Sequence, residues 1–197
     1  MSDPQTIAVY DRRAADYAAR NAVYIRRDPQ LAAFIAACPA GGRVLDLGCG
    51  PGTAAARMAE AGLRPDATDA SAEMVALAAQ APGVTAWQAT FDDIAGVARY
   101  DGIWAGFSLL HAPRADFPRH LAALRQALKP GGTFGIGMKL GEGEARDSIG
   151  RHYTYYTHEA LMNHLRTAGF NPASERRESG KGLDGSMAEL ITVICDG

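Results

Sequence analysis

A short apolar run that ends at closely spaced glycines is the feature that most constrains this fold. Residues 44–47 read Val-Leu-Asp-Leu, and glycines follow at positions 48, 50 and 52. A run of this length that is closed by glycine is too short for a helix and predicts a β-strand. The alanine-rich segment from Thr53 to Gly62 predicts a helix. The chain therefore predicts a strand, a glycine turn and a helix in direct succession.

Strand-like and helix-like segments continue to alternate after this unit. Strands are expected at residues 64–69, 84–90, 100–110, 133–140 and 187–195, with a further strand after residue 170, and helices at residues 72–81, 114–128 and 158–169. This alternation predicts βαβ units and a parallel sheet. Only residues 178–185 separate the last two strands, which permits an antiparallel hairpin but no parallel crossover. We therefore expect an α/β fold with an open, mostly parallel sheet of seven strands, helices on both faces and one antiparallel strand near the C-terminus.

The residues before the first expected strand are helix-like. Residues 6–27 are rich in alanine and arginine and predict one helix, and a second helix is expected to begin near Pro29. A length of 197 residues, of which 47% are apolar, suits one domain with a full core. We expect a single domain over residues 1–197, with a helical cap at residues 1–40 and the sheet at residues 41–197.

Charge and composition weigh against several classes of protein. The formal net charge of −2 favours neither nucleic acid nor a membrane as a partner. No apolar run approaches the ~18 residues of a membrane helix. The N-terminus lacks the basic and apolar regions of a secretory signal, so a cytoplasmic protein is expected. The cysteines at positions 38, 49 and 195 form no C-x-x-C pair and predict neither a disulfide framework nor a metal site. The oligomeric state is left open.

The glycine turn and the acidic residue at the end of the next expected strand together suggest a ligand site. Ligands of open α/β sheets bind beyond the carboxyl ends of the strands, where glycine lets the main chain come close and a helix N-terminus favours an anionic group. Asp69 could accept hydrogen bonds from both hydroxyls of a ribose. The dinucleotide fingerprint G-x-G-x-x-G is not met, because Thr53 occupies its last position. A glycine turn that serves packing alone is the alternative.

The segment VLDLGCGPG resembles motif I of the class I S-adenosylmethionine-dependent methyltransferases. The resemblance extends along nearly the whole chain, because ATDAS-AEM, YDGIWAGFSLLH and LKPGGTFGIGMK are similar to the family's later motifs. The run KLGEGEARDSIGRHYTYYTHEAL resembles a bacterial subgroup described as tellurite-resistance-type methyltransferases. The resemblance implies a Rossmann-like fold, S-adenosyl-L-methionine as cofactor and S-adenosyl-L-homocysteine as product.

Motif I implies specific contacts with the cofactor. The backbone of Gly48, Cys49 and Gly50 is expected beside its methionine portion and ribose. Asp46 is expected to attract the ammonium group, directly or through water, and Asp69 corresponds to the family's ribose-binding carboxylate. Read alone, an aspartate at a strand end is more often a cap or turn residue than a ligand contact.

Further contacts are implied outside motif I. Ala70 and Met74 would pack near the adenine, although Met74 read alone is simply a buried helix residue. Ala105, in the fourth-strand motif, is also expected at the cofactor. Tyr17 best matches a tyrosine that reaches the methionine carboxylate from an N-terminal helix.

The adenine edge departs from the family's usual pattern. Many relatives have an aspartate after the third strand, but here the aligned position is Thr90, whose hydroxyl cannot replace a carboxylate. Asp92 could take that place if the loop is shifted, and Phe91 could cover the ring.

Candidates for the acceptor side follow the fourth and fifth expected strands. His111 and Tyr153 are expected near the reacting methyl group, as catalytic residues. His111 could equally hydrogen-bond a neighbouring carbonyl as scaffold, and Tyr153 could equally pack beneath the next helix. Lys139 and Arg151 could hold an anionic acceptor, and both could equally be solvated. Tyr10, seven residues before Tyr17 and so on the same helix face, is a further candidate for substrate binding. The intervening loop, residues 141–150, is expected to be mobile.

The expected function is methyl transfer to a small molecule by in-line displacement. A general base is needed only if the acceptor must lose a proton, and no motif fixes one. A non-catalytic module that binds S-adenosylmethionine is the alternative, and a nicotinamide-dependent reductase is a weaker one because Thr53 breaks the dinucleotide pattern. The sequence does not identify the acceptor or its reacting atom.

Overall fold

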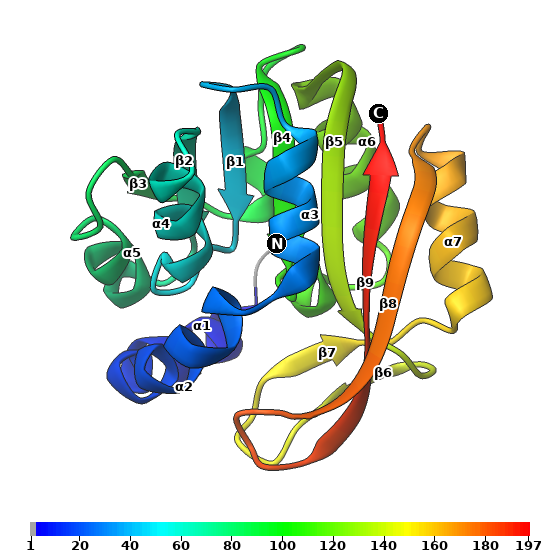
Figure 1. The fold of residues 1–197 in the computed structure, drawn as a ribbon. Helices are drawn as coiled ribbons and strands as arrows, with labels where there is room; N and C mark the ends of the chain where they lie inside the picture. Colours follow the sequence, from blue (N-terminus) through cyan, green and yellow to red (C-terminus); the bar gives the residue numbers. More distant parts are fainter. Residues whose placement is uncertain (1–2) are drawn as a thin grey trace.

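A seven-stranded sheet runs through the centre of the molecule in the computed structural model, which describes residues 3–197 (Figure 1). In spatial order its strands are β3 (Thr85–Gln88), β2 (Arg64–Asp69), β1 (Arg43–Leu47), β4 (Tyr100–Gly106), β5 (Leu128–Lys139), β9 (Met187–Asp196) and β8 (Asn171–Lys181). The strands from β3 to β5 pair in parallel, and β9 is antiparallel to both of its neighbours. The expected mostly parallel sheet with one antiparallel strand is confirmed.

Helices cover both faces of this sheet. One face carries α3 (Pro29–Ala37), α4 (Thr53–Glu60) and α5 (Ala72–Ala78), and the other carries α6 (Phe117–Ala127) and α7 (His158–Thr167). The larger core cluster lies under α6 and α7, where Phe117 and Leu161 pack against Phe134 and Ile136 of β5. Each of these helices has an apolar stripe at helical spacing, which is why it packs on the sheet.

The N-terminal segment contains two helices where the sequence predicted one. They are α1 (Pro4–Arg12) and α2 (Ala14–Arg26), and the chain leaves the helical conformation at Arg13. Asp3 begins α1, because its carboxylate accepts a hydrogen bond from the Thr6 amide at 2.8 Å. Both helices lie at the edge of the sheet where β1 ends, at the bottom of Figure 1. The helix expected near Pro29 is present as α3.

Several boundaries also differ from the sequence prediction. Strand β5 begins at Leu128, whereas the expected strand begins at residue 133, and it includes the Lys-Pro-Gly-Gly stretch. Strand β4 ends at Gly106 and is followed by a short 3₁₀ helix, η2 (Leu109–His111), and another, η1 (Phe91–Asp93), follows β3. Strand β6 (Glu144–Arg146) lies within the region expected to be a loop, and it pairs with β7 (His152–Thr154) in a two-stranded sheet.

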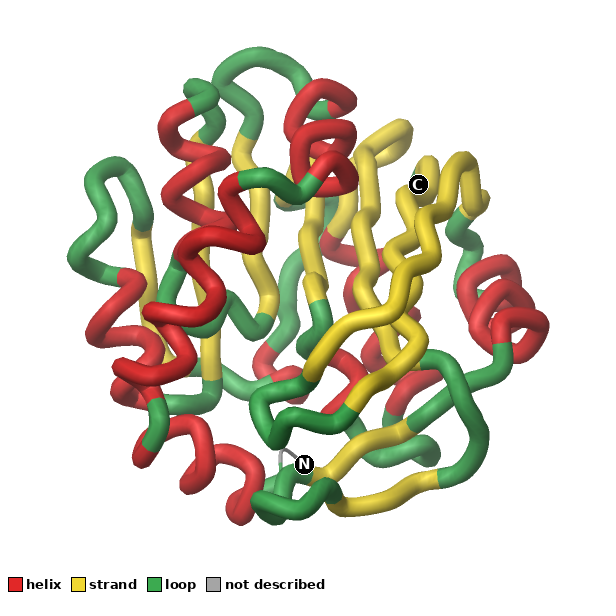
Figure 2. Tube along the Cα trace, turned by 60° about the horizontal axis from the view of Figure 1, so that its bottom comes forward, coloured by secondary structure: helices red, strands yellow, loops and turns green. Residues whose placement is uncertain are grey.

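The edge at which the parallel strands end is bordered by segments far apart in the sequence (Figure 2). Strand β8 runs parallel to β5, since each is antiparallel to β9, so the turn after β8 reaches the same edge as the end of β5. There Arg20 of α2 donates a hydrogen bond to the Leu183 carbonyl at 3.1 Å. The N-terminal helices and the β8–β9 turn therefore enclose this edge from two sides.

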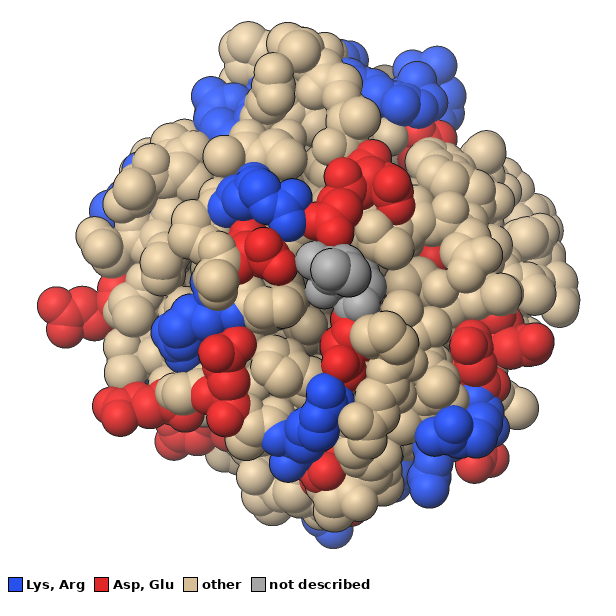
Figure 3. Space-filling model, turned by 180° about the vertical axis from the view of Figure 1, so that it is seen from behind, with Lys and Arg blue, Asp and Glu red and all other residues tan. Residues whose placement is uncertain are grey.

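The back of the molecule carries basic and acidic side chains interspersed with one another (Figure 3). No helix formed by residues 3–197 combines the length and the apolar character that crossing a membrane requires. In the same residues no three histidine, cysteine or acidic side chains are grouped so that they could share a metal ion.

Candidate active site

Two adjoining cavities lie at the edge where the parallel strands end. We call the one beside the glycine turn the turn cavity and the one beside the β8–β9 turn the hairpin cavity. The hairpin cavity measures about 360 Å³ and the turn cavity about 80 Å³. Residues that line both cavities are Tyr10, Tyr17, Gly106, Phe107 and His111. We call these five residues the shared wall.

The glycines of the turn bring the main chain to the surface of the turn cavity. Gly48 and Gly50 have φ angles of +67° and +53°, a region in which side chains are strained. A Cβ atom at Gly48 would lie 2.3 Å from the Cβ of Ser108, and one at Gly50 would lie 3.3 Å from the Tyr17 ring. Gly52 instead allows close packing, because a Cβ there would lie 2.7 Å from Ala78 of α5. Only the first two glycines line the cavity.

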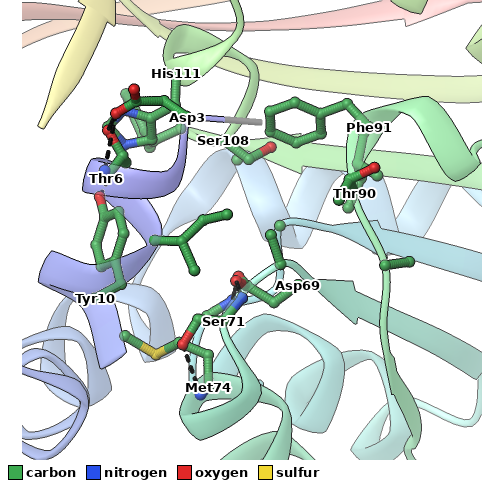
Figure 4. A pocket seen from close by; sticks show the side chains of 18 of the residues that line it. Asp3, Thr6, Tyr10, Asp69, Ser71, Met74, Thr90, Phe91, Ser108 and His111 are labelled. Atoms are coloured by element: carbon green, nitrogen blue, oxygen red, sulfur yellow. Dashed lines mark hydrogen bonds between the residues drawn. The ribbon is translucent and has the colours of Figure 1, made fainter. Parts of the chain in front are cut away.

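Asp69 joins the glycine turn to the end of β2. One carboxylate oxygen accepts a hydrogen bond from the Gly50 amide and the other from the Ser71 amide, both at 2.9 Å. The side chain lines the turn cavity (Figure 4), and each of its oxygens keeps a second lone pair for a ligand. Burial raises the pKa of Asp69, which the two amide donors partly offset.

The start of α5 forms the floor beside Asp69. Ser71 caps this helix, because its hydroxyl oxygen accepts from the Met74 amide at 3.1 Å, and the same hydroxyl donates to Asp11 at 2.6 Å. Met74 is 1% exposed and lines the turn cavity, as does Ala70. The cap fixes where the methionine side chain lies.

Thr90 and Phe91 line the opposite end of the turn cavity. The Thr90 hydroxyl donates to Asp93 at 2.8 Å and accepts from the Asp92 amide at 3.3 Å, so it is engaged in capping η1. Asp92 does not line the cavity, and its carboxylate pairs with Arg119 at 2.5 Å. Phe91 is thus the side chain here that offers a flat apolar surface to a ligand.

Three residues expected at the cofactor do not line either cavity: Asp46, Cys49 and Ala105. Asp46 accepts a hydrogen bond from the Ala55 amide at 3.1 Å, because Gly52 caps α4 without a side chain and leaves amides of the first turn unpaired. Burial raises the pKa of Asp46 to about 7. Cys49 packs against Ala55, and Ala105 lies in the core beneath α6.

His111 is held between a carbonyl and a hydroxyl. Its Nδ1 lies 2.6 Å from the His152 carbonyl oxygen, which can only accept, so we assign the ring proton to Nδ1. Its Nε2 then accepts from the Tyr10 hydroxyl at 2.8 Å. Arg151 donates to the same hydroxyl oxygen at 2.9 Å. Burial lowers the pKa of His111 to about 3, so the ring is neutral at physiological pH.

The remaining acceptor-side candidates line the hairpin cavity. Arg151 is 2% exposed and donates from Nε to Asp147 at 2.9 Å, which neutralises its charge locally. Lys139 places its ammonium group 4.0 Å from the centre of the Tyr153 ring, and that ring lies 4.6 Å from the His111 ring. The Tyr153 ring stacks on the Tyr155 ring.

Both cavities also contain residues that sequence reasoning missed. Ser108 lines the turn cavity with a buried hydroxyl for which residues 3–197 provide no hydrogen-bond partner. Phe107 has a φ angle of +59°, which no sequence signal revealed. Arg20 and Lys181 line the hairpin cavity. Lys181 could have been predicted from the sequence, because it ends β8, and a strand that runs parallel to β5 must end at this edge of the sheet.

Comparison with known proteins adds independent support. Residues 44–132 match the model of a family described as a methyltransferase domain. A solved 1,6-didemethyltoxoflavin N1-methyltransferase from Burkholderia thailandensis, with 1,6-didemethyltoxoflavin and S-adenosylhomocysteine bound, is 24% identical, with a TM-score of 0.75 over 100% of this chain and 91% of that chain.

Two further solved structures share the fold. An S-adenosylmethionine-dependent methyltransferase from Mesorhizobium loti is 22% identical, with a TM-score of 0.68 over 88% of this chain and 100% of that chain. The [4+2]-cyclase SpnF is 20% identical, with a TM-score of 0.69 over 85% of this chain and 79% of that chain. At these identities the likeness establishes the fold. Over residues 44–132 the chain matches the methyltransferase-domain family, and it shares the fold of solved S-adenosylmethionine-dependent methyltransferases.

Proposed function

We propose that this enzyme transfers the methyl group of S-adenosylmethionine to a small molecule bound in the hairpin cavity. The observation that carries the proposal is the shared wall, through which the turn cavity and the hairpin cavity adjoin. Two molecules bound in these cavities would meet at the same five residues. That arrangement is what an in-line transfer between them requires.

The residues of the turn cavity fit the cofactor. Asp69 has unused lone pairs for the ribose hydroxyls, and the main chain at Gly48 and Gly50 carries no side chain that would hold a ligand away. The unpartnered hydroxyl of Ser108 is a further hydrogen-bonding group for it. Tyr17, which lies against Gly50, is assigned to the methionine end, and Phe91 to the adenine end.

When bound, the cofactor supplies an electrophilic methyl group on a sulfonium. The protein's own contribution is to align the acceptor and to exclude water, which can lower a barrier by ~7–11 kcal/mol. The aromatic side chains of the shared wall exclude water, and the engaged Tyr10 and His111 hold that wall in place.

His111 is poorly suited to be a general base. Its Nε2 already accepts the Tyr10 proton, and its lowered pKa of about 3 disfavours taking up another. We therefore assign His111 and Tyr153 positioning roles rather than the catalytic roles that the sequence suggested.

A small-molecule acceptor is favoured by the hairpin cavity, which is enclosed by α2, β5 and the β8–β9 turn. The likeness to a methyltransferase solved with 1,6-didemethyltoxoflavin bound supports the same class of acceptor. The fold is also used by a cyclase, so the transfer itself needs a direct test.

The test supplies the enzyme with methyl-labelled S-adenosylmethionine and a cell extract that has been split by ultrafiltration. We expect label in the low-mass fraction and release of S-adenosylhomocysteine, both lost with Asp69→Asn and both kept with Lys129→Met. Label in protein or nucleic acid would overturn the acceptor class. Cofactor binding without any transfer would support the non-catalytic module instead.

A further inference from the structure

Lys139 is a buried cation for which the described residues, 3–197, provide no partner. It is 6% exposed at the end of β5 and lines the hairpin cavity. Its ammonium group has neither a hydrogen-bond acceptor nor an ion-pair partner among residues 3–197, and it lies 4.0 Å from the centre of the Tyr153 ring. Burying a charge without a partner is costly, and desolvation lowers the pKa of Lys139. A group in this state is expected to serve a ligand.

The acidic residues that face Lys139 are already engaged elsewhere. Asp184 accepts from the Ser186 hydroxyl at 2.8 Å on both oxygens, and Asp147 pairs with Arg151. These are the two carboxylates that act on Lys139 electrostatically, and Arg151 opposes them. The protein itself therefore does not neutralise the lysine by contact.

The lining of the hairpin cavity is predominantly basic. Among the residues that the structure describes, four basic ones line it, Arg20, Lys139, Arg151 and Lys181, against one acidic one, Asp28. The Asp28 carboxylate caps α3, where it accepts from the Gln30 amide at 2.8 Å. The cavity therefore favours a ligand of negative charge.

Aromatic rings lead from Lys139 to the shared wall. Its ammonium lies 4.0 Å from the Tyr153 ring centre, which is 4.6 Å from the His111 ring centre, and that ring is 5.5 Å from Tyr10. A molecule that touches both Lys139 and the shared wall must span about one ring, and flat apolar surfaces suit a planar molecule.

We propose that the acceptor is a planar, conjugated small anion, such as a phenolate or a deprotonated heterocycle, whose charge is bound by the Lys139 ammonium group. This inference rests on the proposed function, because it names the acceptor of the same site. The acceptor's electron pair forms the new bond to the methyl carbon while the carbon–sulfur bond breaks and its electrons stay on sulfur. The anion and the sulfonium both become neutral. No proton is released, so no general base is required.

The anion also resolves the cost of burying Lys139. An opposite charge at contact distance favours the charged ammonium, which offsets the desolvation. The methylated product is neutral, so it loses this attraction and is bound more weakly than the acceptor.

The test uses 4-nitrophenol, whose phenolate absorbs distinctly, and 4-nitroanisole, its neutral methyl ether, with and without S-adenosylhomocysteine. The charged groups that face the bound probe are the four basic residues, Asp28, Asp147 and Asp184, and the neutral ring of His111 is a further titratable group there. We expect the phenolate to bind about tenfold more tightly than the ether, and the bound probe to ionise about one pH unit lower than the free probe. Equal binding of both probes, or binding of neither while S-adenosylhomocysteine binds, would overturn the inference.

Variants of Lys139 separate its charge from its packing. Lys139→Met is expected to lose the tenfold preference and to keep the affinity for 4-nitroanisole, whereas Lys139→Arg keeps the preference. The matched control is Lys129→Met, at the other end of β5, where the lysine pairs with Asp101 at 2.7 Å. A preference that survives Lys139→Met would contradict the assignment.

Two further measurements distinguish a failure of this inference from a structural role of Lys139 and from a failure of the proposed function. Thermal unfolding of Lys139→Met should match the wild type or exceed it, because the substitution removes an unpartnered buried charge; a marked loss would mean that the lysine is structural. Calorimetric binding of S-adenosylhomocysteine reports on the proposed function separately, since it should be unchanged in every Lys139 variant.

Discussion

The Tyr10 hydroxyl lies 2.8 Å from Nε2 of His111, although 101 residues separate the two in sequence. Tyr10 belongs to α1 and His111 to η2 after β4, so this bond ties the N-terminal helices to the centre of the sheet. The same hydroxyl accepts from Arg151, which adds the segment before β7 to the connection.

Tyr10→Phe should destabilise the protein and loosen the acceptor site. The substitution leaves His111 Nε2 and one Arg151 donor without their buried partner, which costs about 1–3 kcal/mol. Urea denaturation measures this loss, and acceptor affinity should fall with it. The control is Tyr24→Phe, whose half-exposed hydroxyl bonds Glu178 at the surface and should cost less than about 0.5 kcal/mol. Equal effects of the two substitutions would contradict the role assigned to Tyr10.

Asp69→Asn should weaken cofactor binding by about 10- to 100-fold. The amide places a donor against either the Gly50 or the Ser71 amide and removes a charged acceptor, worth about 1.5–3 kcal/mol. Calorimetric titration with S-adenosylhomocysteine measures the affinity. Asp93→Asn, which alters an exposed carboxylate at the η1 cap, should leave it within about threefold. Undiminished affinity in Asp69→Asn would separate the carboxylate from the ligand.

Asp46→Asn should change the pH dependence of stability. Burial raises the pKa of the Asp46 carboxyl in the folded state from 3.8 to about 7, so the protonated carboxyl stabilises the fold. This stabilisation is complete below pH 4 and is lost as the pH rises to 7. The loss has an upper bound of about 4 kcal/mol.

Asp46→Asn has no carboxyl to ionise at this position, so it does not lose this stability as the pH rises. Its free energy of unfolding relative to the wild type should therefore rise between pH 4 and pH 8. The titration of His111 occurs in both proteins and cancels in the difference. Denaturation at several pH values checks the trend, and a difference that is flat with pH would show that Asp46 stays ionised. Affinity for S-adenosylhomocysteine should change by less than about threefold, because Asp46 lines neither cavity.

Gly48→Ala should destabilise the protein more than Gly62→Ala. Both glycines have a positive φ angle, +67° and +85°, so both substitutions introduce backbone strain of about 1 kcal/mol or more. At Gly62 nothing lies within 4 Å of the new Cβ, whereas at Gly48 it meets Ser108 at 2.3 Å. Combining Gly48→Ala with Ser108→Gly should recover the part of the loss due to the clash. Denaturation midpoints of the four proteins provide the test.

The turn cavity was largely predictable because its main features are local. The apolar run, the glycine turn and Asp69 lie in one βαβ unit, so their spacing alone places them at one edge of the sheet. The hydrogen bond of Asp46 could not be predicted, because alternation along a strand does not reveal which amide a side chain meets, and here that is the Ala55 amide of α4.

The hairpin cavity could be predicted only in part. Lys139, Arg151 and Tyr153 were identified as candidates because they follow the fifth strand. The hydrogen bond between Arg151 and Tyr10 depends on how α1 packs, and no local sequence pattern encodes that packing. The break of the N-terminal helix at Arg13 was likewise invisible, because arginine is a good helix former.

The shared wall has a consequence for how such an enzyme can acquire a new acceptor. Tyr10, Tyr17 and Phe107 border both ligands, so a substitution that reshapes the acceptor side also disturbs the cofactor side. Lys181, at the end of β8, and Leu183, on the β8–β9 turn, border the hairpin cavity alone. Changes of acceptor, whether by evolution or by engineering, are therefore least costly when they are confined to that turn.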